Sequence, residues 1–329
     1  MRATFLTGFV HSKGFAVVTA IVVLVCAYAF YAHDGVVRIA GEMGFALPSA
    51  NEWIPAPLAN ALVSVAVNGL IAVGIYLTGK LYNVLRTLTL LPVSLYLIFQ
   101  LATPALMLQF YSGGTLCLAI VVCMLLLFSC YRFPDRTRRV FLLFGILSFL
   151  SATQYCFLIY IPVFLLGCAQ MRILNGRTLV AAIMGIVAPW WILFGFGVIS
   201  PASVHLPDFV SIFSEIDFHD TLLLLSTLAL TAFLALAGFV VNSLKAIAYN
   251  ARNRAYNGFF SVLTLVTIAA ACADFRNMVA YVYLLNLCAA YQTAHYFISH
   301  KSDRSYIGVF SIVGVYLAIF VCQTAISIS

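Results

Sequence analysis

The sequence predicts an all-α polytopic membrane protein, a bundle of about eleven transmembrane helices forming one integral membrane domain over residues 1–329. Two observations predict it: 64% of the 329 residues are hydrophobic and only 8% are charged. A soluble globular chain has about 45–50% apolar and about 25% charged residues. Because a transmembrane helix needs ~20 apolar residues, this majority supplies about ten helices. The composition excludes a soluble enzyme, a secreted disulfide domain, a disordered chain and a nucleic-acid-binding domain.

The first predicted helix is an uncleaved one at 14–32. Arg2 and Lys13 precede it, and Ala27-Tyr28-Ala29 looks like a cleavage signal. The apolar run is longer, however, than the roughly 7–15 residues of a signal-peptide core. We therefore expect residues 1–13 to lie at the membrane interface and the run that follows to cross the membrane.

Ten further apolar segments follow this helix. All nine cysteines fall inside apolar runs without CxxC spacing, which favours a role as small hydrophobic residues over disulfides or a metal site. The segments are 58–78, 88–104, 113–131, 140–152, 154–171, 178–198, 221–244, 258–273, 277–298 and 306–327.

The charged residues predict the orientation of these segments. If the N-terminus is cytoplasmic and all segments cross, fifteen of the seventeen Lys and Arg residues are cytoplasmic, and only Arg38 and Arg276 lie outside. Eight of the ten Asp and Glu residues lie outside. This asymmetry follows the positive-inside rule. It predicts a bacterial inner-membrane protein with a cytoplasmic N-terminus and an outer C-terminus.

Two pairs of segments are predicted to form hairpins. Basic clusters flank both ends of 140–171, so a single crossing would place one cluster outside. The segment is therefore a full helical hairpin or a re-entrant pair that turns near Ser151 to Tyr155. The same argument makes 258–298 a hairpin that turns at Asp274-Phe275-Arg276. Two outer loops, 33–57 and 199–220, are long enough to carry a function.

Few polar residues lie within the predicted helices, and none at a helix centre is charged. The absence of a central Asp, Glu, Lys or Arg disfavours a proton-coupled transporter, because intramembrane charges are costly and usually functional. The Asn, Gln and His residues within the helices most often form interhelical hydrogen bonds. They are Asn60, Asn68, Gln100, Gln154, Asn242, Asn286, Gln292 and His295.

The residues that suggest chemistry gather at the outer membrane edge. Asp34 directly follows the first helix, and Arg38 comes one turn later. A carboxylate there can act as a general base, and an arginine can bind a lipid phosphate bidentately. We expect Asp34 to be catalytic and Arg38 and Arg276 to bind a lipid phosphate. The supporting carboxylates are Asp274, Glu42 and Glu52, which Asp208 and Glu215 could join.

Other interpretations of these residues stay open. They can be solvated loop charges that simply follow topology. We expect no required cofactor and no dedicated metal site, although a divalent cation at the outer carboxylates fits their oxygen chemistry. The expected partners are membrane lipids, a lipid-linked sugar and other membrane proteins, but not nucleic acid. Alternatives to a transferase are a scaffold or assembly subunit, or a transporter of an uncharged or lipidic substrate.

The stretch from Arg136 to Val198 carries a resemblance. It combines a basic loop, two short helices around a polar turn, a second basic loop and a helix with the pattern G-x-x-x-P-W-W, here Gly185 to Trp191. With Leu91 to Leu106, it resembles an uncharacterised family of multi-pass inner-membrane proteins of Bacteroidota, known as a domain of unknown function. This resemblance implies a cell-envelope membrane protein.

The chain also resembles the multi-pass GT-C glycosyltransferases, whose first outer loop bears an acidic residue. Asp34 is the matching position. This resemblance implies sugar transfer from a polyprenyl-phosphate donor. The chain departs from the GT-C pattern in a short first outer loop, 33–57, without the Asp-Glu pair seen in many such enzymes, and in an expected lack of a C-terminal soluble domain.

Overall fold

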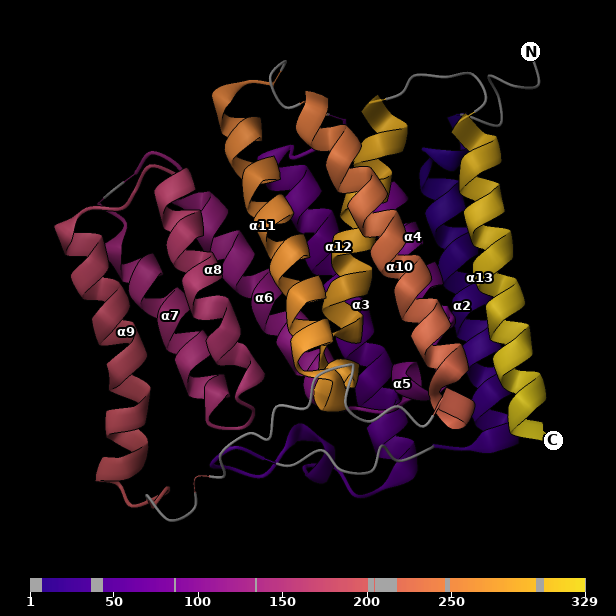
Figure 1. Ribbon diagram of the computed structural model, residues 1–329, viewed down its shortest axis with the longest axis horizontal. Coiled ribbons are helices and arrows are strands. Elements are labelled where there is room, and N and C mark those ends of the chain that lie inside the picture. The colour runs from indigo at the N-terminus through magenta and orange to yellow at the C-terminus, as the bar shows by residue number, and fades with distance from the viewer. Residues whose placement is uncertain are drawn as a thin grey trace.

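A computed structural model describes residues 8–36, 44–85, 87–133, 135–200, 204, 218–245, 249–299 and 305–328. All regular elements in these ranges are helices (Figure 1). They are α2 (Lys13–Asp34), η1 (Ala50–Glu52), α3 (Pro57–Tyr82), α4 (Leu91–Leu101), α5 (Pro104–Leu108), α6 (Ser112–Ser129), α7 (Thr137–Ser151), α8 (Cys156–Gln170), α9 (Gly176–Gly195), α10 (Phe218–Lys245), α11 (Ala251–Ala273), η4 (Phe275–Asn277), α12 (Met278–Ser299) and α13 (Ser305–Ile328).

The helices confirm a polytopic helical membrane protein. Seven of those described are long and apolar enough to cross a bilayer: α2, α3, α6, α9, α10, α11 and α13. At 1.5 Å per residue, α7 and α8 are each about 22 Å long, shorter than the ~30 Å hydrocarbon core. Helix α12 is long, but it carries Asn286, Gln292 and His295, all of which are buried. Its polar residues face protein rather than lipid.

The predicted segment 88–104 is two helices rather than one. Helix α4 ends at Leu101, and Pro104 begins the short helix α5. Proline has no N–H to donate and its ring clashes with the preceding turn, so α4 cannot continue through it. The Gln100 carbonyl instead accepts a hydrogen bond from the Thr103 backbone N–H at 3.1 Å. The apolar run thus reaches Leu108, further than predicted.

Helix α12 lies at the centre of the bundle, and nearly all of its residues are buried. It packs against α4, α6, α10 and α11. Helices α7 and α9 form a second, closely packed pair at one side of the molecule (Figure 1). A Cβ atom at Gly185 would lie 2.6 Å from the Phe141 carbonyl oxygen, so glycine permits this close approach.

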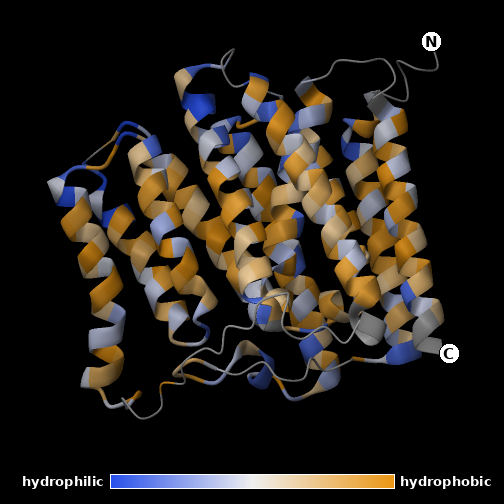
Figure 2. Ribbon diagram, viewed as in Figure 1, coloured by the Kyte–Doolittle hydropathy of each residue, from blue (hydrophilic) through white to orange (hydrophobic). Residues whose placement is uncertain are grey.

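The two ends of the bundle differ in charge. At one end, which we call the basic end, α3, α6, α8 and α10 finish and α7, α9 and α11 begin. Figure 2 shows hydrophilic residues concentrated at the helix ends and hydrophobic residues between them. Within the described part, Arg276 is the one Lys or Arg at the opposite end. The basic end holds Lys13, Lys80, Arg132, Arg136, Arg138, Arg139, Arg172, Arg177, Lys245, Arg252 and Arg254.

We call the opposite end the loop end, because the segment Gly44–Glu52, hereafter the cap segment, lies across it. The backbone N–H of Phe45 donates to the Thr153 carbonyl at 3.1 Å, and the N–H groups of Ala46 and Leu47 both donate to the Ala152 carbonyl at 2.8 Å. The first predicted outer loop is therefore bound to the turn between α7 and α8. Helices α2 and α13 finish at this same end (Figure 1).

Candidate functional site at the loop end

Asp34 is the last residue of α2, which extends two residues beyond the predicted end at residue 32. The helix ends there because Gly35 adopts a positive φ of 69°. The His33 Nδ1 atom lies 2.9 Å from Asp34 Oδ1. The His33 side chain is 55% exposed and the Asp34 side chain only 11%. The carboxylate is thus mostly shielded at the end of a membrane helix, while the imidazole beside it can meet solvent.

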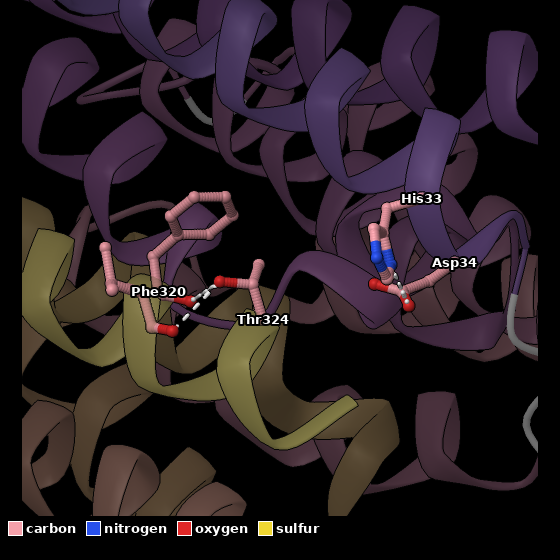
Figure 3. A network of polar contacts seen from close by, with 5 residues as sticks. His33, Asp34, Phe320 and Thr324 are labelled. Atoms are coloured by element: carbon pink, nitrogen blue, oxygen red, sulfur yellow. Dashed lines mark hydrogen bonds and ion pairs between the residues drawn. The ribbon is translucent and has the colours of Figure 1, made fainter. Parts of the chain in front are cut away.

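Helix α13 finishes close to this pair. Phe320 of α13 belongs to the same buried hydrophobic cluster as Val23, Ala27 and Phe30 of α2. Thr324, one turn further along α13, donates to the carbonyl oxygens of Phe320 at 3.2 Å and Val321 at 2.9 Å. Figure 3 shows His33 and Asp34 in the same region as Phe320 and Thr324. Helix α2 packs mainly on α4 and α5, and this packing positions Asp34 at the loop end.

Glu52 lies at the end of η1 in the cap segment and is exposed. The Ser49 hydroxyl donates to Glu52 Oε1 at 3.5 Å, a weak contact. Beside it, Gln109 Nε2 donates to the Asn51 side-chain oxygen, and Trp53 packs against Phe110 with ring centroids 6.1 Å apart. These contacts hold the cap segment against the junction of α5 and α6. Glu52 remains accessible on its outer surface.

Asp274 occupies a different position at the same end, and its side chain has no solvent exposure. Its Oδ2 atom accepts hydrogen bonds from the hydroxyl of Tyr155 and, at 3.0 Å, from that of Tyr281. Its Oδ1 atom accepts from Asn277 Nδ2 at 3.0 Å. We call these four residues the Asp274 cluster. It joins the α7–α8 turn to the α11–α12 turn.

The Tyr155 hydroxyl is held as a hydrogen-bond donor. Burial, together with its hydrogen bond to Asp274 and the charge of that carboxylate, raises the pKa of Tyr155. The Phe45 ring of the cap segment lies against Tyr155, with ring centroids 6.5 Å apart. The cap segment therefore covers the Asp274 cluster from the loop end.

The structure does not describe the side chains of the remaining predicted site residues. Arg38 and Glu42 lie outside the described residues, as do Asp208 and Glu215. Arg276 lies in η4 between Asp274 and Asn277, and its side chain is outside the description. Of the predicted residues with described side chains, Asp34 is beside α13, Glu52 is on the cap segment and Asp274 is beneath it. Each makes its own contacts.

Sequence reasoning missed the partners of Asp274. Asn277 and Tyr281 follow Asp274 at spacings of three and seven, which place them on one helical face. That signal was available in the sequence. Tyr155 is 119 residues away from Asp274, and no sequence pattern links the two turns. Among the described residues, no three His, Cys, Asp or Glu side chains converge in a way that would hold a metal ion.

Four of the eight predicted interior polar residues, Asn68, Asn242, Gln292 and His295, form interhelical hydrogen bonds. Gln100 instead bonds to Tyr96 within α4, and among the described residues the buried Oε1 atoms of Gln100 and Gln154 and Nδ2 of Asn286 have no partner. Tyr96 donates to Asn68 Oδ1 at 3.1 Å, and Asn68 Nδ2 donates to the Tyr283 hydroxyl at 3.1 Å. The Ser64 and Tyr283 hydroxyls donate to the carbonyls of Met107 and Leu106, at 2.7 and 3.1 Å. Because α5 ends at Leu108, the Met107 carbonyl lacks a helical donor and the Leu106 carbonyl accepts the Gln109 backbone N–H at 3.3 Å, so the side-chain hydroxyls complete the bonding of both.

A second polar network lies near the basic end. His295 Nδ1 is 2.7 Å from Asn242 Oδ1, and Asn242 Nδ2 donates to Gln292 Oε1 at 2.7 Å. His295 Nε2 is 3.2 Å from Asn257 Nδ2. Gln292 and His295 lie on one face of α12, because both contact Asn242. The network joins α10, α11 and α12.

Comparisons with known proteins add no relative: no protein-family model, no curated protein and no solved structure matches this chain.

Proposed function

We propose that this protein is an integral protein of the bacterial inner membrane with eleven crossings, a cytoplasmic N-terminus and an outer C-terminus. The bias of Lys and Arg to the basic end supports a cytoplasmic location for that end. Trp190 and Trp191 lie in the last two turns of α9, at the loop end, where aromatic residues favour a membrane–water interface. The loop end then faces outward.

We further propose that the protein is a GT-C-like transferase that takes a sugar from a polyprenyl-phosphate-linked donor at the loop end. The observation that carries this proposal is the His33–Asp34 contact of 2.9 Å at the end of α2. A shielded carboxylate beside an exposed imidazole, at the membrane edge, has the chemistry of a general base. It also ends a helix long enough to span a bilayer, so we expect it to lie near the lipid phosphates.

The transfer proceeds as one displacement. Asp34 removes the proton from a hydroxyl of the acceptor, and that oxygen forms a bond to the anomeric carbon of the donor sugar. The bond between this carbon and the phosphate oxygen breaks, and the electron pair leaves with the polyprenyl phosphate. Arg38 and Arg276 would bind the charge on that phosphate. Asp34 then holds the proton, and the His33 contact positions its carboxyl group throughout.

The Asp34→Asn variant tests this assignment. An amide cannot accept the proton, so we expect turnover of a polyprenyl-phosphate-linked hexose, added to membranes containing the protein, to fall about 100-fold or more. The protein should still fold and express. Asp135→Asn, an equivalent change at the basic end, is the matched control and should retain full turnover.

Two results would contradict the proposal. Full turnover by Asp34→Asn would remove Asp34 as the base. An unmodified protein that releases no polyprenyl phosphate from this donor would remove the transfer itself.

We favour the transferase over a transporter or a scaffold for the following reasons. A transporter needs a polar cavity at mid-membrane, but Asn68, Gln100 and Asn286 are each at most 2% exposed. A scaffold would use small-residue faces for partners. Gly185 is occupied by α7, and Gly74 lies against Val121, where a Cβ would approach to 2.3 Å, so these two glycines serve contacts inside the chain. At Gly69 and Gly195 a Cβ would meet no such neighbour within 4 Å, so these two are open to a partner.

A further inference from the structure

A hollow of about 150 Å³ lies between α10 and α11 in the half of the bundle near the loop end. Leu225, Leu228, Ala229 and Ala232 of α10 form one wall, and Ile268, Ala271 and Cys272 of α11 form the other. Its floor is Leu285 of α12, and it ends at Phe275 and Met278 beside the α11–α12 turn. All of these side chains are apolar or weakly polar.

Small side chains create this hollow. Ala229 and Ala232 on α10 and Ala271 and Cys272 on α11 line it, where larger residues would narrow the gap between the helices. Nearer the basic end, α10 instead lies tightly on α12, since a Cβ at Gly238 would meet the Gln292 backbone at 2.8 Å. Figure 1 shows α12 between α10 and α11. Helix α10 is thus held on α12 near the basic end, while a space remains between α10 and α11 nearer the loop end.

The hollow opens onto the surface that faces the bilayer. Ala229 and Cys272 are exposed, and so are large apolar side chains on the adjoining helix faces, such as Leu222, Phe233 and Leu265. A void in a packed interior forfeits dispersion contacts, so an open apolar hollow next to lipid is filled by hydrocarbon. Water gains no hydrogen bond there, because the lining offers no strong polar group.

We propose that this hollow binds one hydrocarbon chain of a bilayer phospholipid, in the leaflet nearest the loop end. The chain lies between α10 and α11 and rests on Leu285. The end wall at Phe275 and Met278 places the phospholipid head group beside the α11–α12 turn. This site stands independently of the proposed sugar transfer, since its residues are different and its ligand is an ordinary membrane lipid.

The experiment reconstitutes the full chain in phosphatidylcholine vesicles that contain a phospholipid with a photoactivatable diazirine in one acyl chain. After irradiation, mass spectrometry maps the adducts. We expect adducts on the peptides that contain 225–232 and 268–285 to exceed those on the other bilayer-facing helices at least fivefold. An even distribution over all such helices would overturn the proposal, because the lipid contact would then be a general one.

Two paired variants test the same site by filling it. Ala232→Leu with Ala271→Leu should lower the adducts on these peptides at least fivefold. Ala237→Leu with Ala269→Leu, on exposed positions of the same two helices outside the hollow, is the control and should leave them unchanged. Equal labelling of both pairs would contradict a specific site. If the filled pair does not fold, the distribution of adducts on the unmodified protein still decides.

Discussion

Asp274 shows how a mostly apolar protein can hold a fully buried carboxylate. An unpaired buried charge costs several kcal/mol, so it needs donors. Tyr155, Tyr281 and Asn277 supply three of them, from two turns and a helix. Hydrogen bonds to a charged group contribute about 1.5–3 kcal/mol each. The Asp274 cluster therefore connects the α7–α8 turn to the α11–α12 turn beneath the cap segment and stabilises their contact.

Removing the charge of Asp274 should weaken the contact between these two turns. In Asp274→Asn the new amide N–H groups face hydroxyl or amide donors, so at least one buried polar group loses its partner. We expect the free energy of unfolding to fall by about 1–3 kcal/mol, measured by denaturant titration in detergent. Tyr155→Phe should act in the same direction, because it removes one donor. Tyr28→Phe, at a side chain that is 73% exposed, should change nothing.

At this scale the sequence predicted the site incompletely. It placed Asp34 at a helix end and Asp274 at a hairpin tip, and both positions are correct. It did not predict that Asp274 is buried, since burial depends on Tyr155 and on a cap segment distant in sequence. Hydropathy alone predicts that a charged residue at a turn is exposed to solvent. Its burial becomes apparent only from the tertiary contacts.

The helices themselves were largely predictable. Each of the eleven predicted segments overlaps a helix, because a long apolar run in lipid must satisfy its backbone internally. Two departures have physical causes. Helix α11 begins at Ala251, seven residues before the predicted 258, because its first turns carry Arg252 and Arg254 and extend beyond the apolar run. The break between α4 and α5 follows from Pro104, a local effect that hydropathy does not detect.

The α7–α9 contact gives a prediction at the level of helices. Gly185→Ala places a Cβ 2.6 Å from the Phe141 carbonyl oxygen and should separate the two helices. We expect a loss of about 1–3 kcal/mol in the free energy of unfolding, the usual cost of overpacking. Gly195→Ala, on the same helix with no atom within 4 Å, is the control.

A thermal unfolding curve for each variant checks this expectation. Gly195→Ala should be neutral or slightly stabilising, since alanine favours helix more than glycine does. Equal stability of the two variants would mean that α7 and α9 do not approach as closely as the structure has them.

For the whole molecule, the distribution of charge carries more information than the apolar majority. The apolar residues define a membrane protein, whereas the basic residues separate one end of the bundle from the other. The loop end holds the cap segment, Asp34, Glu52 and the Asp274 cluster. The proposed transfer and the proposed lipid site both lie at or near it. The proposed sugar transfer and the leaflet of the proposed lipid site therefore both depend on which side of the membrane the loop end faces.

Labelling of single introduced cysteines on intact cells tests that orientation most directly. Trp53→Cys at the loop end and Leu174→Cys at the basic end replace side chains that are 48% and 50% exposed. A membrane-impermeant thiol reagent, measured against the unmodified protein as background, should label Trp53→Cys on intact cells and Leu174→Cys only after permeabilisation. Labelling of Leu174→Cys on intact cells, with Trp53→Cys protected, would contradict the account.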